Sequence, residues 1–107
     1  ARLAPGQEAA MPDFAKPDIV LHVRVTGRVQ GVAYRAWARA TALDLGLRGW
    51  VRNRGDGSVE ALIAGPEERV RAMVLAMSEG PAAARVTDVL AEDAAPAAVP
   101  PGFEVRA

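Results

Sequence analysis

The sequence contains no cysteine, one histidine and one lysine in 107 residues. Without cysteine, the chain can form no disulfide, thiolate nucleophile or Cys-ligated zinc site. The one histidine, His22, falls on the polar side of an alternating strand pattern, which favours an exposed strand residue over a catalyst. No His, Asp and Glu residues have the spacing of metal ligands, so we expect no metal site and no cofactor.

The chain also lacks a charge excess and a long apolar run. Its formal net charge is zero, and aromatic residues make up 5% of it. Without a basic block or interleaved aromatic residues, a nucleic-acid surface is not expected. No segment approaches transmembrane length and no signal-peptide core is visible, so we expect a cytoplasmic protein that does not bind membranes.

Half of the residues are hydrophobic, which is enough for one small domain with a modest core. Residues 1–18 are rich in Ala, Pro and Gly without sustained periodicity, and we interpret them as a flexible N-terminal extension. The domain is then predicted to span residues 19–107. Apolar periodicity predicts its elements in chain order: strand 19–26, helix 34–45, strands 47–53 and 58–64, helix 66–79, strand 85–91 and a short strand 103–106.

Local signals support several of these elements. Asp56-Gly57 between two strand patterns predicts an antiparallel hairpin. Pro66 is expected at the first position of the second helix. The order βαββαβ with an added fifth strand predicts an α+β, ferredoxin-like split βαβ fold, in which two helices cover one face of an antiparallel sheet.

The stretch from Gly27 to Arg35 joins the first predicted strand to the first helix and contains two glycines. Glycine permits the positive φ angles of a tight loop, and a loop entering a helix directs free N–H groups at one point. Arg35, in the first helical turn, could bind two oxygens of the same anion. Spacing alone leaves two interpretations open: a phosphoryl-binding loop, or a plain strand-to-helix turn with a solvated arginine.

Residues 27–35 resemble the first signature of the acylphosphatase family, and Gly49 to Asn53 with Gly57-Ser58-Val59 resembles the second. The resemblance implies a ferredoxin-like fold, with Arg35 binding the phosphate and Asn53 placing the nucleophilic water. It also implies a phosphate cradle built from the backbone amides of Val29, Gln30, Gly31, Val32, Ala33, Tyr34 and Arg35. No protein base is recognised in that family, so the substrate itself would accept the proton.

The residues present suit such a substrate. An acyl phosphate expels a carboxylate, which needs no proton from a general acid, so positioning and charge stabilisation can suffice. An amide such as Asn53 can accept a hydrogen bond from water and orient it for in-line attack. We therefore expect a metal-independent, monomeric acylphosphatase that takes a small-molecule acyl phosphate and releases a carboxylate and inorganic phosphate.

Three alternatives stay open at this point. A non-catalytic anion-binding or regulatory module could use the same fold, because ferredoxin-like folds serve many functions. The acylphosphatase-like domain of a carbamoyl-transferring maturation factor is another. An RNA-recognition module would need stacking aromatic residues on the central strands, and residues 19–26 contain none.

Overall fold

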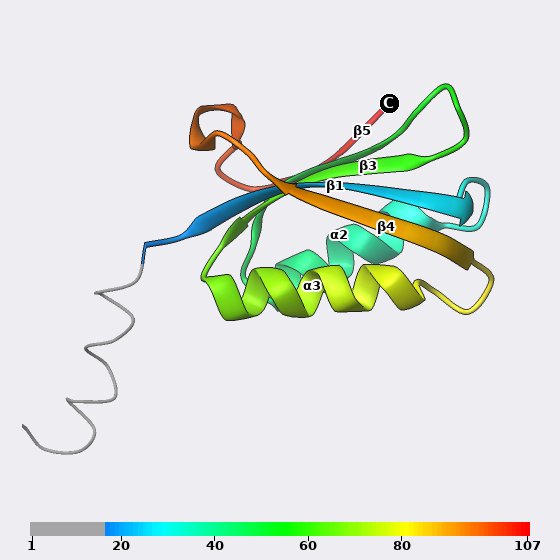
Figure 1. Ribbon diagram of the computed structural model, residues 1–107, viewed down its shortest axis with the longest axis horizontal. Coiled ribbons are helices and arrows are strands. Elements are labelled where there is room, and N and C mark those ends of the chain that lie inside the picture. Colours follow the sequence, from blue (N-terminus) through cyan, green and yellow to red (C-terminus); the bar gives the residue numbers. More distant parts are fainter. Residues whose placement is uncertain (1–16) are drawn as a thin grey trace, which may run out of the picture.

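The computed structural model describes residues 17–107. The predicted N-terminal extension, residues 1–18, therefore lies outside the described residues except for Pro17 and Asp18. The elements follow in the predicted order: β1 (Ile19–Arg28), α2 (Tyr34–Asp44), β2 (Arg48–Asn53), β3 (Val59–Gly65), α3 (Glu67–Glu79), β4 (Arg85–Asp93), the short 3-10 helix η1 (Pro96–Ala98) and β5 (Phe103–Arg106). Both helices lie on the same side of the sheet (Figure 1).

The five strands form one sheet in the order β4-β1-β3-β2-β5. The first four are antiparallel, as predicted, and β2 and β3 form the expected hairpin, with Asn53 opposite Val59. The expectation of a wholly antiparallel sheet is corrected by β5, which runs parallel to β2. The chain reaches this edge through η1 and a connection across the end of the sheet, and that crossover sets the direction of β5. The ferredoxin-like fold class is confirmed.

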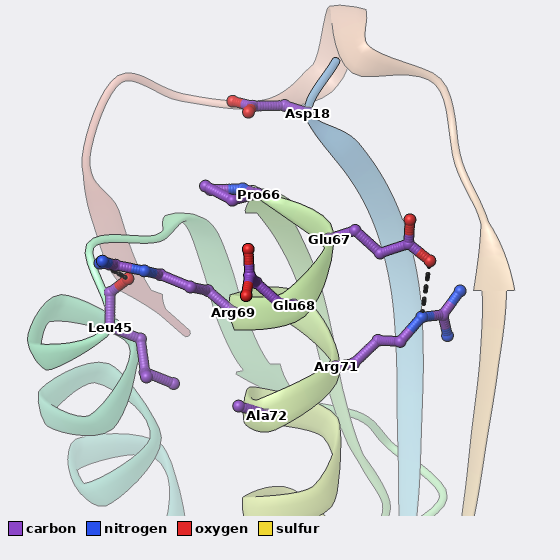
Figure 2. Close-up of a pocket in the computed structure, with 8 residues that line it drawn as sticks. All are labelled: Asp18, Leu45, Pro66, Glu67, Glu68, Arg69, Arg71 and Ala72. Carbon is purple, nitrogen blue, oxygen red and sulfur yellow. Dashed lines mark hydrogen bonds and ion pairs between the residues drawn. The ribbon is translucent and has the colours of Figure 1, made fainter. Parts of the chain in front are cut away.

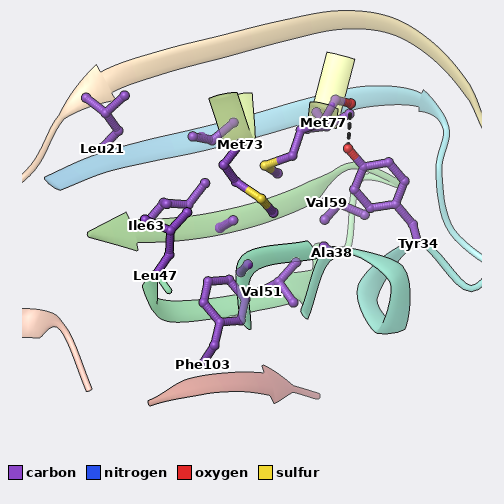
Figure 3. Packing of buried hydrophobic residues seen from close by; sticks show 14 of the residues in the cluster. Leu21, Tyr34, Ala38, Leu47, Val51, Val59, Ile63, Met73, Met77 and Phe103 are labelled. Atoms are coloured by element: carbon purple, nitrogen blue, oxygen red, sulfur yellow. Dashed lines mark hydrogen bonds between the residues drawn. The ribbon is translucent and has the colours of Figure 1, made fainter. Parts of the chain in front are cut away.

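The core lies between the sheet and the two helices (Figure 3). Every second residue in the middle of β1, namely Leu21, Val23 and Val25, is buried, which matches the predicted alternation. The α3 helix contributes Val70, Met73 and Met77, all buried. The two methionines are therefore core residues.

The packing of α2 and the start of α3 show how the two helices meet the sheet. The buried face of α2 consists of Tyr34, Ala38 and Ala42, while Trp37 is partly buried against the core. Small alanines let α2 approach the sheet closely, so the larger side chain lies at the margin. Pro66 has an extended ψ of 138° and is the N-cap of α3, one residue before the predicted helical position. Both helices nevertheless begin within one residue of the expected start.

Candidate active site

The loop between β1 and α2 follows a tight path that its glycines permit. A Cβ atom at Gly27 would lie 2.1 Å from the Arg85 carbonyl oxygen of β4, where the β1–β4 register shifts. Gly31 has φ of 75°, and a Cβ there would meet nothing within 4 Å. Gly27 is thus required by close packing, whereas Gly31 faces open space in a conformation that side chains disfavour.

Ala33 caps the N-terminus of α2 in the left-handed conformation, with φ of 62°. It is the one non-glycine residue with positive φ in the described chain. No side chain caps this helix, and its first turn holds no acidic residue. The first N–H groups of α2 are therefore free of a capping acceptor, and the helix dipole there favours a negative charge.

Two buried side chains hold the loop in place. Val29 is 1% exposed and packs in the core. The Tyr34 hydroxyl donates a 2.6 Å hydrogen bond to the Met77 carbonyl at the far end of α3 (Figure 3). Burial raises the pKa of Tyr34 well above its usual range, so its hydroxyl stays protonated. Since both side chains point into the core, only their backbone groups are available to an anion at the loop.

Arg35 follows directly and is half-buried. One guanidinium nitrogen, Nη1, donates a 2.9 Å hydrogen bond to the Arg106 carbonyl of β5. One helical turn later, Arg39 Nε donates to the Phe103 carbonyl of the same strand at 3.1 Å. A guanidinium has five N–H donors, so the Arg35 contact fixes the side chain and leaves donors for an anion.

Asn53 ends β2, at the start of the hairpin turn. It shares strand parity with Val51, which is buried beneath the helices, so both lie on the helix-covered side of the sheet. The turn is ordered by Asp56, whose carboxylate accepts hydrogen bonds from the hydroxyl (2.5 Å) and the N–H (2.9 Å) of Ser58. These two bonds lower the pKa of Asp56.

The loop, the start of α2, the end of β2 and β5 line an open cavity of about 220 Å³. Arg35 and Asn53, predicted from separate motifs, both line it. Among the described residues, the lining consists of Val29, Gly31, Ala33, Tyr34, Arg35, Ala36, Asn53 and Val105. Gln30 and Val32, which the resemblance placed in the cradle, are not among these residues. The sequence analysis did not identify Ala36 of α2 or Val105 of β5. For Val105, no sequence pattern indicated that β5 would reach this cavity.

The acylphosphatase family model matches residues 21–105 of this chain. The chain belongs to the acylphosphatase family. A relative called acylphosphatase from Rhizobium meliloti (strain 1021) is 54% identical over 83 residues, which are 78% of this chain and 87% of the relative. The solved structure of an acylphosphatase from Coxiella burnetii is 35% identical, with a TM-score of 0.78, and the match covers 86% of this chain and 96% of that one.

The acylphosphatase fold also occurs inside larger proteins. The structure of T. kodakarensis HypF matches at 28% identity and a TM-score of 0.72, over 81% of this chain but only 12% of that one. By contrast, this chain spans most of the length of the Rhizobium meliloti relative.

A second hollow, of about 730 Å³, lies at the other end of α2, where Leu45 faces the start of α3 (Figure 2). Its acidic residues are Asp18, Glu67 and Glu68. The two glutamates lie in the first turn of α3, where their negative charges interact favourably with the positive end of the helix dipole. The Arg71 side chain is paired with Glu67, and Arg69 with the Leu45 carbonyl. The hollow thus combines a helix N-terminus and two arginines with three carboxylates, which oppose the binding of an anion.

The sheet face opposite the helices carries a charged cluster around Glu60, which is 5% exposed. Its carboxylate accepts hydrogen bonds from Arg52 Nε at 2.6 Å and from His22 Nε2 at 2.5 Å. Burial opposes ionisation of Glu60, but the bonds from Arg52 and His22 outweigh it and lower the pKa of this carboxyl. His22 is thus half-buried and hydrogen-bonded to Glu60, where the sequence predicted an exposed residue.

Within residues 17–107, no three His, Asp or Glu side chains gather as a potential metal site. No helix in the same part of the chain is long and apolar enough to cross a membrane.

Proposed function

We propose that this protein hydrolyses acyl phosphates to a carboxylate and inorganic phosphate, with Arg35 holding the phosphoryl group and Asn53 orienting the attacking water. The proposed reaction is supported by membership of the acylphosphatase family and by the names of the relatives. The meeting of Arg35 and Asn53 at one small cavity supports the residue roles. The loop amides at the start of α2 complete the proposed phosphate site.

The reaction follows from these positions. The water oxygen attacks phosphorus, the bond from phosphorus to the acyl oxygen breaks, and the carboxylate leaves with the bonding electrons. The arginine and the amides stabilise the charge on the phosphoryl oxygens, which is the main requirement of phosphoryl transfer. Of residues 17–107, those that line the cavity include no carboxylate or imidazole. The proton from water therefore passes to a phosphoryl oxygen of the substrate.

An assay of benzoyl phosphate hydrolysis tests this proposal. We expect turnover by the purified protein in the presence of excess chelator, together with competitive inhibition by inorganic phosphate. Phosphate binding without turnover would instead support the non-catalytic anion-binding module. The predicted cytoplasmic location, the monomeric state and the absence of nucleic-acid binding stay predictions.

A further inference from the structure

The Gln30 side chain does not line the cavity, although Gln30 lies in the middle of the anion-binding loop. It reaches sideways to the β2–β3 hairpin. Its Nε2 donates two hydrogen bonds of 2.8 Å each, to the Arg54 and Ser58 carbonyl oxygens. Because both partners are acceptors, only the NH2 end of the amide can face them, and both of its hydrogens are used.

These two carbonyls lie on opposite sides of the hairpin turn: Arg54 directly follows Asn53, and Ser58 directly precedes β3. The Arg54 N–H also donates to the Ser58 carbonyl at 2.8 Å, so Gln30 joins a bond that closes the turn. Within residues 17–107, two hydrogen bonds join loop 27–33 to turn 54–58, and the Gln30 side chain donates both of them. Gln30 therefore connects the element that carries the anion site to the element that carries Asn53.

We infer that Gln30 is a positioning residue, whose side chain sets the distance between the phosphate loop and the water-orienting amide of Asn53. This inference rests on the proposed function. The loop and α2 are anchored separately through Val29 and Tyr34, so the anion site keeps its shape without the Gln30 amide. The hairpin turn is ordered by its own hydrogen bonds, from Ser58 to Asp56 and from Arg54 to Ser58, and none of these bonds fixes its distance from the loop. Loss of the two bonds should therefore move Asn53 relative to the phosphorus while phosphate binding survives.

The test is Gln30→Met, which keeps the length of the side chain and removes both donors. A displacement of about 1 Å can cost about a hundredfold in rate. We expect kcat for benzoyl phosphate to fall by about ten- to a hundredfold, while Kd for inorganic phosphate stays within about threefold. Gln30→Ala should give the same split, and it replaces Gln30→Met if that variant does not fold.

Thr41→Val is the matched control. The Thr41 hydroxyl also donates to a backbone carbonyl, that of Trp37, at 2.9 Å in a half-buried setting, but it joins neither the loop nor the hairpin. Thr41→Val should lower the melting temperature to an extent similar to Gln30→Met and leave kcat unchanged.

A double-mutant cycle decides whether Gln30 acts through Asn53. In an Asn53→Ala background, Gln30→Met should lower kcat by less than about threefold, because the group that it positions is already absent. A full additional loss there would overturn the inference, and so would an unchanged kcat in Gln30→Met. An equal loss of phosphate affinity would overturn it too, by showing that Gln30 shapes the anion site itself. Wild-type protein without turnover would instead overturn the proposed function, and this inference with it.

Discussion

Arg35 uses part of its guanidinium to bind the backbone of the last strand, through the Arg106 carbonyl. Arg35 also lines the cavity that Asn53 lines, and its guanidinium has further N–H donors beyond this bond. A planar guanidinium can satisfy both partners at once, whereas the ammonium of lysine is a compact point charge without that fork. The choice of arginine at this position therefore matters for geometry as well as for charge.

We predict that Arg35→Ala loses phosphate binding and lowers kcat/KM by about a hundredfold to a thousandfold, as expected for removal of a major oxyanion donor. Arg35→Lys should recover little of this loss. Arg39→Ala is the control, because it removes the neighbouring bond to the Phe103 carbonyl and Arg39 does not line the cavity. Isothermal titration with phosphate and steady-state kinetics measure both effects. Near-normal kinetics in either Arg35 variant would place the anion site elsewhere.

Asn53 should matter for turnover far more than for binding. It lines the cavity opposite the loop and carries no charge to attract the dianion. Asn53→Ala is expected to keep phosphate affinity within a few-fold, while kcat falls by about a hundredfold or more, in the range of lost positioning. Equal losses of binding and turnover would make Asn53 a structural turn residue.

Among the elements, β5 shows most clearly what the sequence does not specify. Its four residues were predicted at 103–106, and the structure places them there. Its parallel direction follows from the crossover through η1, which no side-chain pattern indicated. Its contact with Arg35 uses a backbone carbonyl, a group that every residue has. The same holds for the Gln30 bonds, whose acceptors are the carbonyls of Arg54 and Ser58.

The strongly patterned elements were predictable for a physical reason. Burial of one sheet face enforces the alternation seen in β1, and Asp56-Gly57 supplies the turn geometry of the β2–β3 hairpin. The positions of Arg35 and Asn53 followed from motifs, and the structure brings both residues to one cavity. Their catalytic roles stay predictions, because the location of a side chain does not show its contribution to the rate.

The central strands also carry an ion-pair cluster that affects stability. The folded protein lowers the pKa of Glu60, because the hydrogen bonds and charges of Arg52 and His22 outweigh the cost of burial. A lowered carboxyl pKa stabilises the fold above the unfolded pKa, about 4.3, and this contribution is lost as pH falls through the lower folded value. The cluster should therefore make the protein sensitive to acid below about pH 4.3.

We predict that Glu60→Gln lowers the free energy of unfolding at neutral pH by about 1–3 kcal/mol, typical of hydrogen bonds to a charged group. The difference from wild type should shrink in acid, where the wild-type carboxyl becomes protonated. Urea unfolding at several pH values measures it. Glu104→Gln, which removes an exposed carboxylate paired with Arg106, should change stability by less than about 1 kcal/mol. A Glu60→Gln effect that is constant from neutral pH into acid would contradict this account.

At the scale of the whole molecule, the sheet separates the proposed catalytic residues from the one histidine of the chain. Arg35 and Asn53 lie on the helix-covered side, while His22 pairs with Glu60 on the opposite face and does not line the cavity. Histidine is the side chain that ordinarily titrates near neutrality. The proposed mechanism, with a stable carboxylate as leaving group and an oriented water as nucleophile, needs no protein group to titrate there.

We therefore predict that kcat is nearly constant between about pH 5 and 8, without the bell-shaped profile of an acid–base pair. His22→Gln should keep most of the activity, because glutamine can still donate a hydrogen bond to Glu60 and the change occurs on the far face of the sheet. Excess chelator should leave the rate unchanged in both proteins. The measurement is the pH dependence of kcat for benzoyl phosphate in wild type and His22→Gln. A sharp bell centred near neutrality that disappears in the variant would show that His22 acts as a general base, and the water would then be activated by a proton acceptor in the protein.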